Sequence, residues 1–277
     1  MKNNDIPPSI YIGGAGCGAA FFIGAIHALK EKWGEDVHNK TMFCGDSIGS
    51  ILALQLAIGY SSNDIELISR NIFRKMRTEP HFFYGNDYWL NKYIDHLMDK
   101  HKDLHRTVKG KFKCGTTKFP FYHQWHDKWE NNNELSLCLK ASTNIPIYCS
   151  KCEKINDYEV IDGAYGFNGN HFPHGNETLF IGANQPSAEI SHNLTRSEMT
   201  YPDNHLIFND LFKKGCDAFH KWDGIKKEKV NTRKPNYFAL IVCWFCKGLQ
   251  IFYQYTYDMV NEEETKSVKP LMETIQN

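Results

Sequence analysis

Residues 44–50 read CGDSIGS and separate a short strand-like run at 40–43 from an almost wholly apolar run at 48–59. The stretch fits G-x-S-x-G, the nucleophile-elbow motif, in which a serine sits on a sharp turn from a strand into a helix. A Cβ at either glycine would clash in so tight a turn, and the N-terminal amides of the helix favour negative charge beside the serine. The stretch therefore predicts a short strand over 40–43, a nucleophilic Ser47 and a buried helix over 48–59.

The position of this motif in the chain restricts the fold. Only 46 residues precede Ser47, which leaves room for one strand–helix unit and a second strand. An α/β hydrolase places its elbow after several such units, so the chain order favours a fold whose nucleophile follows the second strand. Strand–helix alternation with glycine turns predicts an α/β fold with a largely parallel sheet. Further strands are predicted at 9–12, 134–139, 159–161 and 179–181, further helices at 20–32, 61–76, 87–101 and 207–222, and no element over 102–133.

A glycine-rich loop follows the first predicted strand, in residues 9–24, SIYIGGAGCGAAFFIG. Backbone amides in such a loop can hold either the phosphates of a nucleotide or a developing oxyanion. A loosened dinucleotide fingerprint is present at Gly14, Gly16 and Ala19, but it requires an acidic residue after the second strand to bind ribose. The acidic residue there is Asp46, which lies inside the serine motif. The dinucleotide alternative therefore leaves that motif unexplained.

A serine hydroxyl needs a proton acceptor to become a good nucleophile. Thirteen histidines are present, but none has the local signature of a catalytic base. A better candidate is Asp162 in residues 158–168, YEVIDGAYGFN, because it directly follows a predicted strand, at the end where parallel sheets bind ligands. The alternative for Asp162 and Gly163 alone is an ordinary Asp-Gly turn.

Taken together, the glycine loop, Ser47 and Asp162 resemble the patatin-like phospholipase family, whose lipid acyl hydrolases use a Ser–Asp dyad without histidine. Residues 141–148, ASTNIPIY, are similar to the family's A-S-x-x-x-P segment. Asn168 matches the asparagine that follows the family's D-G-G motif, which is D-G-A here. These motifs are specific as a set, although each alone is weak.

Two further segments indicate the branch of the family. Residues 15–18, AGCG, and 211–219, LFKKGCDAF, resemble the animal-type branch that includes triacylglycerol lipases. The resemblance covers about residues 9–182 and continues more weakly to about 222. The loop departs from the family at Gly18, where a basic residue is usual, and at Ala19, where a glycine is usual. A catalytically weak relative that binds lipid is the alternative that this altered loop leaves open.

The resemblance implies a three-layer α/β/α sandwich with a mostly parallel central sheet, and a lipid ester as the substrate. It implies that Ser47 is the nucleophile and Asp162 the general base, with no cofactor and no metal. The amides of the glycine loop would form the oxyanion hole, and further glycines would form the elbow and the turn after the base. These residues are Gly14, Ala15, Gly16 and Cys17 in the oxyanion hole, and Gly45, Gly49 and Gly163 in the elbow and turn.

The composition gives no sign of a nucleic-acid partner. The 277 residues include 32 Lys+Arg and 32 Asp+Glu, so the net charge is zero and an anionic partner would need a local patch. Nine cysteines, an odd number, and an N-terminus without an apolar signal segment predict a reducing, cytoplasmic location. Zinc is not expected at Cys149, Cys152, Cys243 and Cys246, because the two pairs are far apart and the second lies in an apolar run.

Two parts are expected in the chain: a catalytic domain over 8–222 and a basic, aromatic-rich helical extension over 223–277. Residues 237–257, YFALIVCWFCKGLQIFYQYTY, are interrupted by polar residues too often for a membrane span. Beside the basic stretch 221–234, they suit a peripheral contact with a membrane or lipid-droplet surface. Packing of this segment on the core is the alternative.

Overall fold

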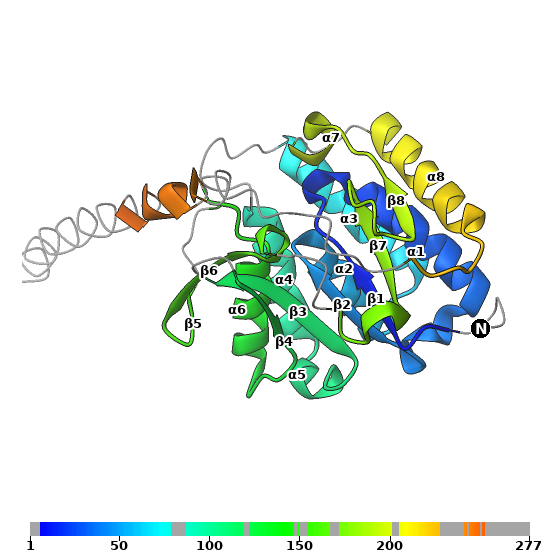
Figure 1. Ribbon diagram of the computed structural model, residues 1–277. Coiled ribbons are helices and arrows are strands. Elements are labelled where there is room, and N and C mark those ends of the chain that lie inside the picture. Colours follow the sequence, from blue (N-terminus) through cyan, green and yellow to red (C-terminus); the bar gives the residue numbers. More distant parts are fainter. Residues whose placement is uncertain are drawn as a thin grey trace, which may run out of the picture.

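The computed structural model describes residues 6–78, 87–118, 122–146, 149, 154–166, 172–200, 205–227, 241–242, 244–249 and 251–252. Within them, strands and helices alternate from the N-terminus and build a central sheet flanked by helices (Figure 1). The first strand, β1 Ser9–Ile12, is parallel to both of its neighbours, β2 Met42–Asp46 and β7 Thr178–Ala183. Strand β2 is also parallel to β3 Phe112–Lys118. The expected α/β class with a mostly parallel central sheet is confirmed.

In the described part of the chain the sheet has eight strands, hydrogen-bonded in the order β5-β6-β3-β2-β1-β7-β8, with β4 paired to β3. Strands β4 and β6 run antiparallel to β3. The strand that precedes Ser47 is thus the second in the chain and lies beside the first, as the chain order predicts. The strands are β1 Ser9–Ile12, β2 Met42–Asp46, β3 Phe112–Lys118, β4 Tyr122–His126, β5 Lys154–Ile155, β6 Tyr158–Asp162, β7 Thr178–Ala183 and β8 Ile190–His192.

The helices bury their apolar residues against the sheet and against one another. Helix α2 follows Ser47 and is buried at every residue from Gly49 to Ala57, which confirms the buried helix expected from its apolar sequence. The predicted cap of α3 is present, because Ser61 Oγ accepts from the Asp64 N–H at 3.0 Å. The helices are α1 Ala19–Trp33, α2 Ile48–Ala57, α3 Ser62–Thr78, α4 Tyr88–Lys100, α5 Leu104–Thr107, α6 Asn132–Ser142, α7 Arg196–Thr200 and α8 His205–Lys221.

Helices α1 and α8 lie side by side at the edge of the domain (Figure 1) and approach through glycines. A Cβ at Gly24 would lie 1.9 Å from the carbonyl oxygen of Phe212, and a Cβ at Gly215 would lie 2.0 Å from that of Phe21. Each helix therefore needs a glycine where the backbone of the other passes. This close packing makes α8 an integral part of the core.

Strand β3 brings the ends of two other strands together. Asp46, the last residue of β2, pairs with Gly115 of β3. Asp162, the last residue of β6, pairs with the next residue of β3, Thr116. Strand β4 pairs with both positions from the other side, so β2 and β6 share one edge of β3. Because β2 runs parallel and β6 antiparallel to β3, their carboxyl ends meet.

Residues 134–139 are helical, so the strand predicted there is wrong. They belong to α6, whose first turn is capped by the side chain of Asn131. The sequence ELSLCL alternates as a strand would, but the buried positions include i, i+3, i+4 and i+7 counted from Leu135. The described part of residues 102–133, for which no element is predicted, contains α5, β3, β4 and the start of α6. Strand β2 also continues through Gly45, beyond its predicted end.

The described residues between 241 and 252 are helical and extend away from the sheet (Figure 1). Most of their large apolar side chains are exposed, whereas the Lys247 side chain is buried. No helix among the residues that the structure describes is long and apolar enough to cross a membrane. The rest of residues 237–257 lies outside the described part.

Candidate active site

Ser47 occupies a strained turn between β2 and α2. Its backbone angles are φ 55° and ψ −136°. Sparsely populated backbone conformations of this kind cost a non-glycine residue about 1–3 kcal/mol. A Cβ at Gly45 would lie 2.3 Å from the carbonyl oxygen of Gly49, and a Cβ at Gly49 would lie 2.3 Å from that of Gly13. The strand, the strained serine and the helix form the elbow that G-x-S-x-G predicts.

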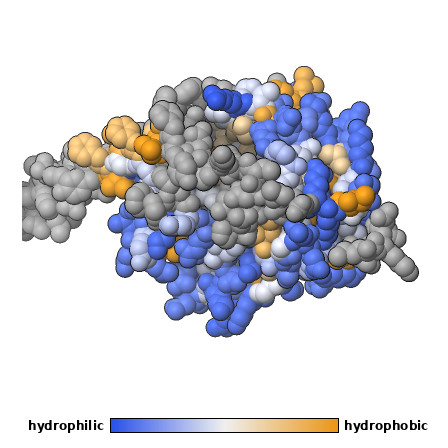
Figure 2. Space-filling model, viewed as in Figure 1, coloured by the Kyte–Doolittle hydropathy of each residue, from blue (hydrophilic) through white to orange (hydrophobic). Residues whose placement is uncertain are grey.

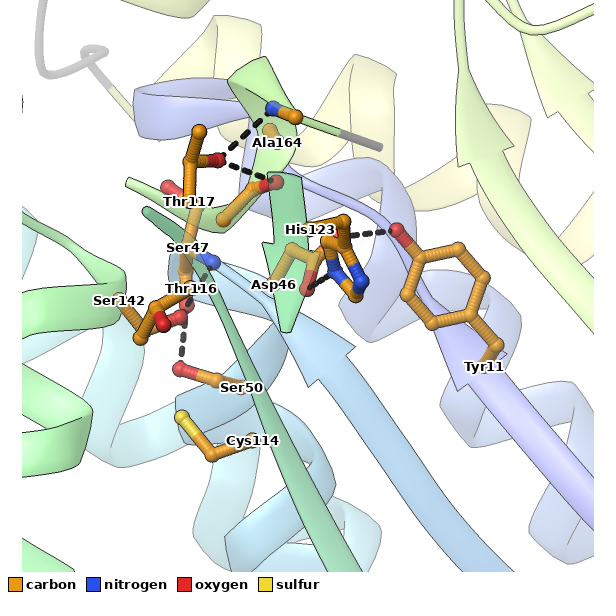
Figure 3. A network of polar contacts seen from close by, with 12 residues as sticks. Tyr11, Asp46, Ser47, Ser50, Cys114, Thr116, Thr117, His123, Ser142 and Ala164 are labelled. Atoms are coloured by element: carbon orange, nitrogen blue, oxygen red, sulfur yellow. Dashed lines mark hydrogen bonds and ion pairs between the residues drawn. The ribbon is translucent and has the colours of Figure 1, made fainter. Parts of the chain in front are cut away.

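Two other serines hold the elbow in this conformation (Figure 3). The N–H of Ser47 donates to Ser142 Oγ at 3.0 Å. The N–H and the hydroxyl of Ser50 donate to the Ser47 carbonyl at 2.9 and 2.6 Å. Both supporting serines are completely buried. The hydroxyl of Ser47 itself is therefore not needed to hold the turn.

Asp162 reaches the elbow from the end of β6. Its N–H donates to the carbonyl of Asn144 at 3.0 Å, and its Oδ1 accepts from the N–H of Ala164 at 2.9 Å. Thr117 Oγ1 donates to the Asp162 carbonyl at 2.8 Å. The residue is 2% exposed, so water has little access to the carboxyl group. Backbone and side chain are thus both fixed.

The environment of Asp162 favours its protonated form at acidic pH. Burial is the largest influence and raises the pKa of Asp162 to about 7, and the charge of Asp46 also raises it. The nearby Ser47 side chain and the Ala164 N–H lower the pKa. Oδ2 is buried and accepts no hydrogen bond from the described residues. A carboxylate with this pKa can accept a proton from a neighbouring hydroxyl.

The glycine loop lies directly against Ser47. A Cβ at Gly14 would lie 3.1 Å from Ser47 Cβ and 2.8 Å from Ala164 Cβ, so only glycine fits between them. The Gly13 N–H is committed to the carbonyl of Ile181, whereas the N–H groups of Gly14 and Ala15 make no hydrogen bond with another described residue. These two amides can therefore donate to a ligand atom beside Ser47.

The remaining loop residues contact α7. Gly16 has φ 53°, and a Cβ there would lie 2.4 Å from the carbonyl oxygen of Met199. Cys17 Sγ donates to the carbonyl of Thr200 at 3.7 Å. At Gly18, where the sequence lacks the usual basic residue, a Cβ would lie 2.5 Å from Leu194 Cδ1. Helix α7 and the segment before it thus occupy the space that a side chain at position 18 would need.

A cavity of about 520 Å³ is lined by Ser47, Asp162 and the glycine loop. Its volume lies in the range of roughly 300–1,000 Å³ that is usual for ligand sites. Further polar side chains in the wall include Asp87, Asn184 and Gln185, but much of the wall is apolar and comes from α2, α3, α4 and the segment after α6. These apolar residues are Ile48, Ile72, Phe73, Met76, Leu90 and Ile145.

None of the described histidines lines this cavity. The described residues also contain no group of three His, Cys, Asp or Glu placed to hold a metal ion. Cys149 lines the cavity and Cys246 lies in the C-terminal segment. Their sequence partners Cys152 and Cys243 lie outside the described residues, as does Asn168.

Sequence patterns do not reveal several residues that support the site. Residues 142–144 join its two halves, since Ser142 holds the N–H of Ser47 and the Asn144 carbonyl holds the N–H of Asp162. The A-S-x-x-x-P segment contains both and was the available signal. Asp46 was visible only as a variable position of G-x-S-x-G, although its side chain is completely buried beside the elbow.

A family model described as patatin-like phospholipase matches residues 10–172, which include Ser47 and Asp162. The chain belongs to the patatin-like phospholipase family. The match ends before β7, although β7 pairs with β1 at the centre of the sheet. The fold of this patatin-like phospholipase therefore extends beyond the matched residues.

Two solved structures are similar to this patatin-like phospholipase. The heterodimeric complex ExoU–SpcU from the type III secretion system of Pseudomonas aeruginosa has 14% sequence identity, a TM-score of 0.38, and coverage of 77% of this chain and 51% of that chain. The type III effector protein ExoU has 10% identity, a TM-score of 0.42, and coverage of 79% and 54%. The chain thus spans about half the length of these two proteins. No curated protein matches the chain.

Proposed function

We propose that this patatin-like phospholipase hydrolyses carboxylic ester bonds of phospholipids or acylglycerols through Ser47 and Asp162. The observation that carries the proposal is the strained, buried Ser47 beside a carboxyl group with a pKa of about 7. Residues in strained backbone conformations cluster at active sites, where the surroundings hold them in place. A hydroxyl next to an oriented base is the arrangement that acyl transfer requires.

In the proposed acylation step, Ser47 Oγ attacks the ester carbonyl carbon and its proton passes to Asp162. The tetrahedral intermediate then loses the alcohol, which takes the proton from Asp162 as its bond to the acyl carbon breaks. In deacylation, Asp162 takes a proton from water, and the water oxygen attacks the acyl carbon. The bond to Ser47 Oγ breaks, Oγ recovers the proton, and the fatty acid leaves.

The glycine loop supports this mechanism through its free amides. The N–H groups of Gly14 and Ala15 make no hydrogen bond with another described residue, both residues line the cavity, and Gly14 lies beside Ser47. We assign Gly16 and Cys17 to the same loop wall. Loss of one oxyanion donor typically lowers the rate by about 10²–10³. The N-terminus of α2 adds its dipole at the same place.

The apolar part of the cavity supports a lipid substrate. An acyl chain extending from Ser47 along Ile72, Met76 and Leu90 would exchange water for aliphatic contacts, at about 25 cal/mol per Å² of apolar surface buried. A small polar ester would gain little from this wall. The proposal therefore specifies a fatty acyl ester.

A fluorophosphonate probe tests the nucleophile, because it forms a covalent bond with an activated serine. We expect labelling at Ser47, complete loss of labelling and acyl hydrolysis in Ser47→Ala, and a loss of about 10²–10⁴-fold in Asp162→Asn. Ser187→Ala and Asp157→Asn are matched controls, since both lie outside the cavity, and they should keep wild-type rates. A wild-type rate in Ser47→Ala or Asp162→Asn would refute the dyad.

The same probe separates the competing functions. A protein that binds fatty acid or lipid vesicles but is not labelled at Ser47 would be a lipid-binding relative with little catalysis. A protein that binds NAD and is not labelled would revive the dinucleotide alternative for the glycine loop. With a labelled protein, hydrolysis rates across phospholipids, triacylglycerols and monoacylglycerols identify the ester.

We also propose that the domain over 8–222 is held at a lipid surface by the C-terminal extension, 223–277. Six large apolar side chains on the described helical residues between 241 and 252 are 39–67% exposed (Figure 2). The spacing of all but Ile251 places them on one face of the helix. Lys247 points the other way: its Nζ donates to the Val160 carbonyl at 3.3 Å and forms an ion pair with Glu159 at 3.4 Å. The residues on the shared apolar face are Ile241, Val242, Phe245, Leu249 and Phe252.

This orientation is the reverse of that of a helix packed on a core, since the apolar face is outward. It suits insertion into the headgroup region of a lipid surface, close to the strand that carries Asp162. Sedimentation with phosphatidylcholine–phosphatidylserine vesicles tests it. Phe245→Ser with Phe252→Ser should lower vesicle binding at least tenfold and spare hydrolysis of a soluble ester. Tyr122→Ser, which removes an aromatic ring that is 69% exposed on β4, is the matched control. Unchanged vesicle binding in the double variant would refute the anchor.

A further inference from the structure

Asp46, the residue before Ser47, carries a completely buried carboxyl group (Figure 3). Tyr11 OH donates to its Oδ2 at 2.6 Å, and His123 Nε2 lies 2.9 Å from its Oδ1. The side chains of Asp46 and His123 are both 0% exposed. Because a carboxylate oxygen only accepts hydrogen bonds, Nε2 is the protonated nitrogen in this contact. The group is thus bonded from β1 on one side and from β4 on the other.

Two glycines leave room for this carboxyl group. A Cβ at Gly115 would lie 1.8 Å from Asp46 Oδ1 and 2.6 Å from His123 Nε2. A Cβ at Gly163, the residue after Asp162, would lie 2.8 Å from the same oxygen. Four segments therefore surround this carboxyl group. Strands β1 and β4 provide hydrogen-bond donors, and β3 and the turn after β6 provide glycines that leave space for it. The elbow itself requires no acid at this position, since the second residue of G-x-S-x-G is variable.

The site adjoins the chain at both members of the proposed dyad. Asp46 is bonded through the chain to Ser47, and its Oδ1 approaches the backbone of the residue that follows Asp162. Burying a carboxylate is costly unless hydrogen bonds compensate it. The two donors supply that compensation. The carboxyl group is therefore kept at a buried position where an apolar side chain would need no hydrogen bonds.

We propose that Asp46, held by Tyr11 and His123, is a positioning residue that fixes the Ser47 elbow and strengthens Asp162 as a proton acceptor through its negative charge. This inference rests on the proposed roles of Ser47 and Asp162. A negative charge nearby opposes a second negative charge, so a proton on Asp162 is held more firmly than burial alone would hold it.

The other ionisable groups around Asp162 are uncharged or paired, so Asp46 is the source of the negative charge that acts on Asp162. Burial, the largest influence on both, raises the pKa of Tyr11 and of Cys149 well above their ordinary values, so neither side chain is charged near neutral pH. Lys247 is paired with Glu159 at the other part of β6. The groups that face Asp162 or its strand are Tyr11 from β1, Asp46 and Ser47 from β2 and its elbow, His123 from β4, Cys149 after α6, Glu159 on β6, and Lys247 from the C-terminal segment.

Carbon-13 NMR of the full chain, labelled at aspartate carboxyl carbons, tests the inference without using activity. The Asp162 resonance is assigned by its loss in Asp162→Asn. In Asp46→Asn, and independently in Asp46→Ala, we expect the Asp162 titration midpoint to fall by about one pH unit. Tyr11→Phe removes one donor but keeps the charge of Asp46, so the Asp162 midpoint should move less in this variant. Asp157→Asn, in an exposed turn before β6, is the matched control and should not move it.

Hydrolysis of a soluble ester provides the second readout. Asp46→Asn should lower kcat about tenfold, shift the acidic limb of the pH profile to lower pH, and leave KM unchanged. An unchanged midpoint in the folded Asp46 variants would overturn the inference, and so would failure of both to fold while Tyr11→Phe and His123→Gln fold normally. A wild-type protein that is inactive and is not labelled by the fluorophosphonate probe would instead overturn the dyad. The NMR midpoint of Asp162 would still show whether Asp46 raises its pKa.

Discussion

Asp46 and Asp162 end their strands opposite adjacent residues of β3. One strand arrives parallel to β3 and the other antiparallel, so two chain segments more than a hundred residues apart deliver their last side chains to the same place. The proposed nucleophile is the next residue after the first of these ends. The register of β3 therefore determines the distance between Ser47 and its proposed base.

The activity of the protein should depend on pH through Asp162. The base must be deprotonated to accept a proton, and burial raises its pKa to about 7. We therefore expect kcat/KM for a soluble ester to fall about tenfold per pH unit below about pH 7 and to level off above it. Ser187→Ala should give the same profile. A flat profile from pH 5 to 8 would contradict the role of Asp162 as base.

The same carboxyl group should make the protein less stable as pH rises. Its folded pKa, about 7, exceeds the ordinary value of 3.8, so proton binding favours the folded state. This contribution is fully present below about pH 4 and is lost as pH rises through 7. Asp162→Asn lacks this contribution. The unfolding free energy of the variant minus that of wild type should therefore rise by about 2–3 kcal/mol from pH 5 to pH 8.5.

Urea unfolding at the two pH values measures this difference. Titration of all other groups cancels when the variant is compared with wild type at each pH. Ser47→Ala keeps the carboxyl group and should show the wild-type pH dependence. If the unfolding free energy changed equally with pH in wild type and Asp162→Asn, burial would not raise the pKa of Asp162.

Replacement of Ser47 by glycine should stabilise the protein. Glycine adopts positive φ without steric cost, so the change removes about 1–3 kcal/mol of strain and loses about 0.5–1 kcal/mol of backbone entropy. We expect Ser47→Gly to be about 1 kcal/mol more stable than Ser47→Ala, which loses the hydroxyl but keeps the strained conformation. Equal urea midpoints for these two inactive variants would show that the elbow is not strained.

The altered glycine loop can be tested by restoring a basic residue. Gly18→Lys would place Cβ against Leu194 Cδ1 and should destabilise the protein by about 1–3 kcal/mol. Leu194→Ala removes the obstructing atoms, so the double variant should be more stable than the sum of the single effects predicts. Urea unfolding of the four proteins in the cycle measures this coupling. Additive effects would mean that another contact excludes the side chain.

The central α/β order of the chain was predictable, because each early element has a distinct local pattern. Strand β1 and helices α1 and α2 have apolar runs bounded by glycines, and their predicted bounds agree with the structure within two residues. Helix α6 was mispredicted because its sequence also alternates in polarity. Its helical form depends on a cap at Asn131 and on the burial of one face by tertiary contacts.

The predicted site residues Ser47, Asp162 and Gly14 are brought together, but their roles remain proposals. Local sequence could identify Ser47 and Gly14 because turns at strand ends need glycine and have recognisable spacing. It could not identify Asp46, Tyr11 and His123 as one cluster. Their contacts depend on the sheet order and on the pairing of β4 with β3, a region without a clear sequence pattern.

The contact between α1 and α8 also affects how the protein is made. Cys216 Sγ donates to the Gly24 carbonyl at 3.2 Å across a separation of 192 residues. A ribosome completes α1 long before it completes α8, so one apolar side of α1 has no partner during most of translation. The domain can finish folding only when α8 has left the exit tunnel. A nascent chain that stalls earlier would expose α1 and become a substrate for chaperones.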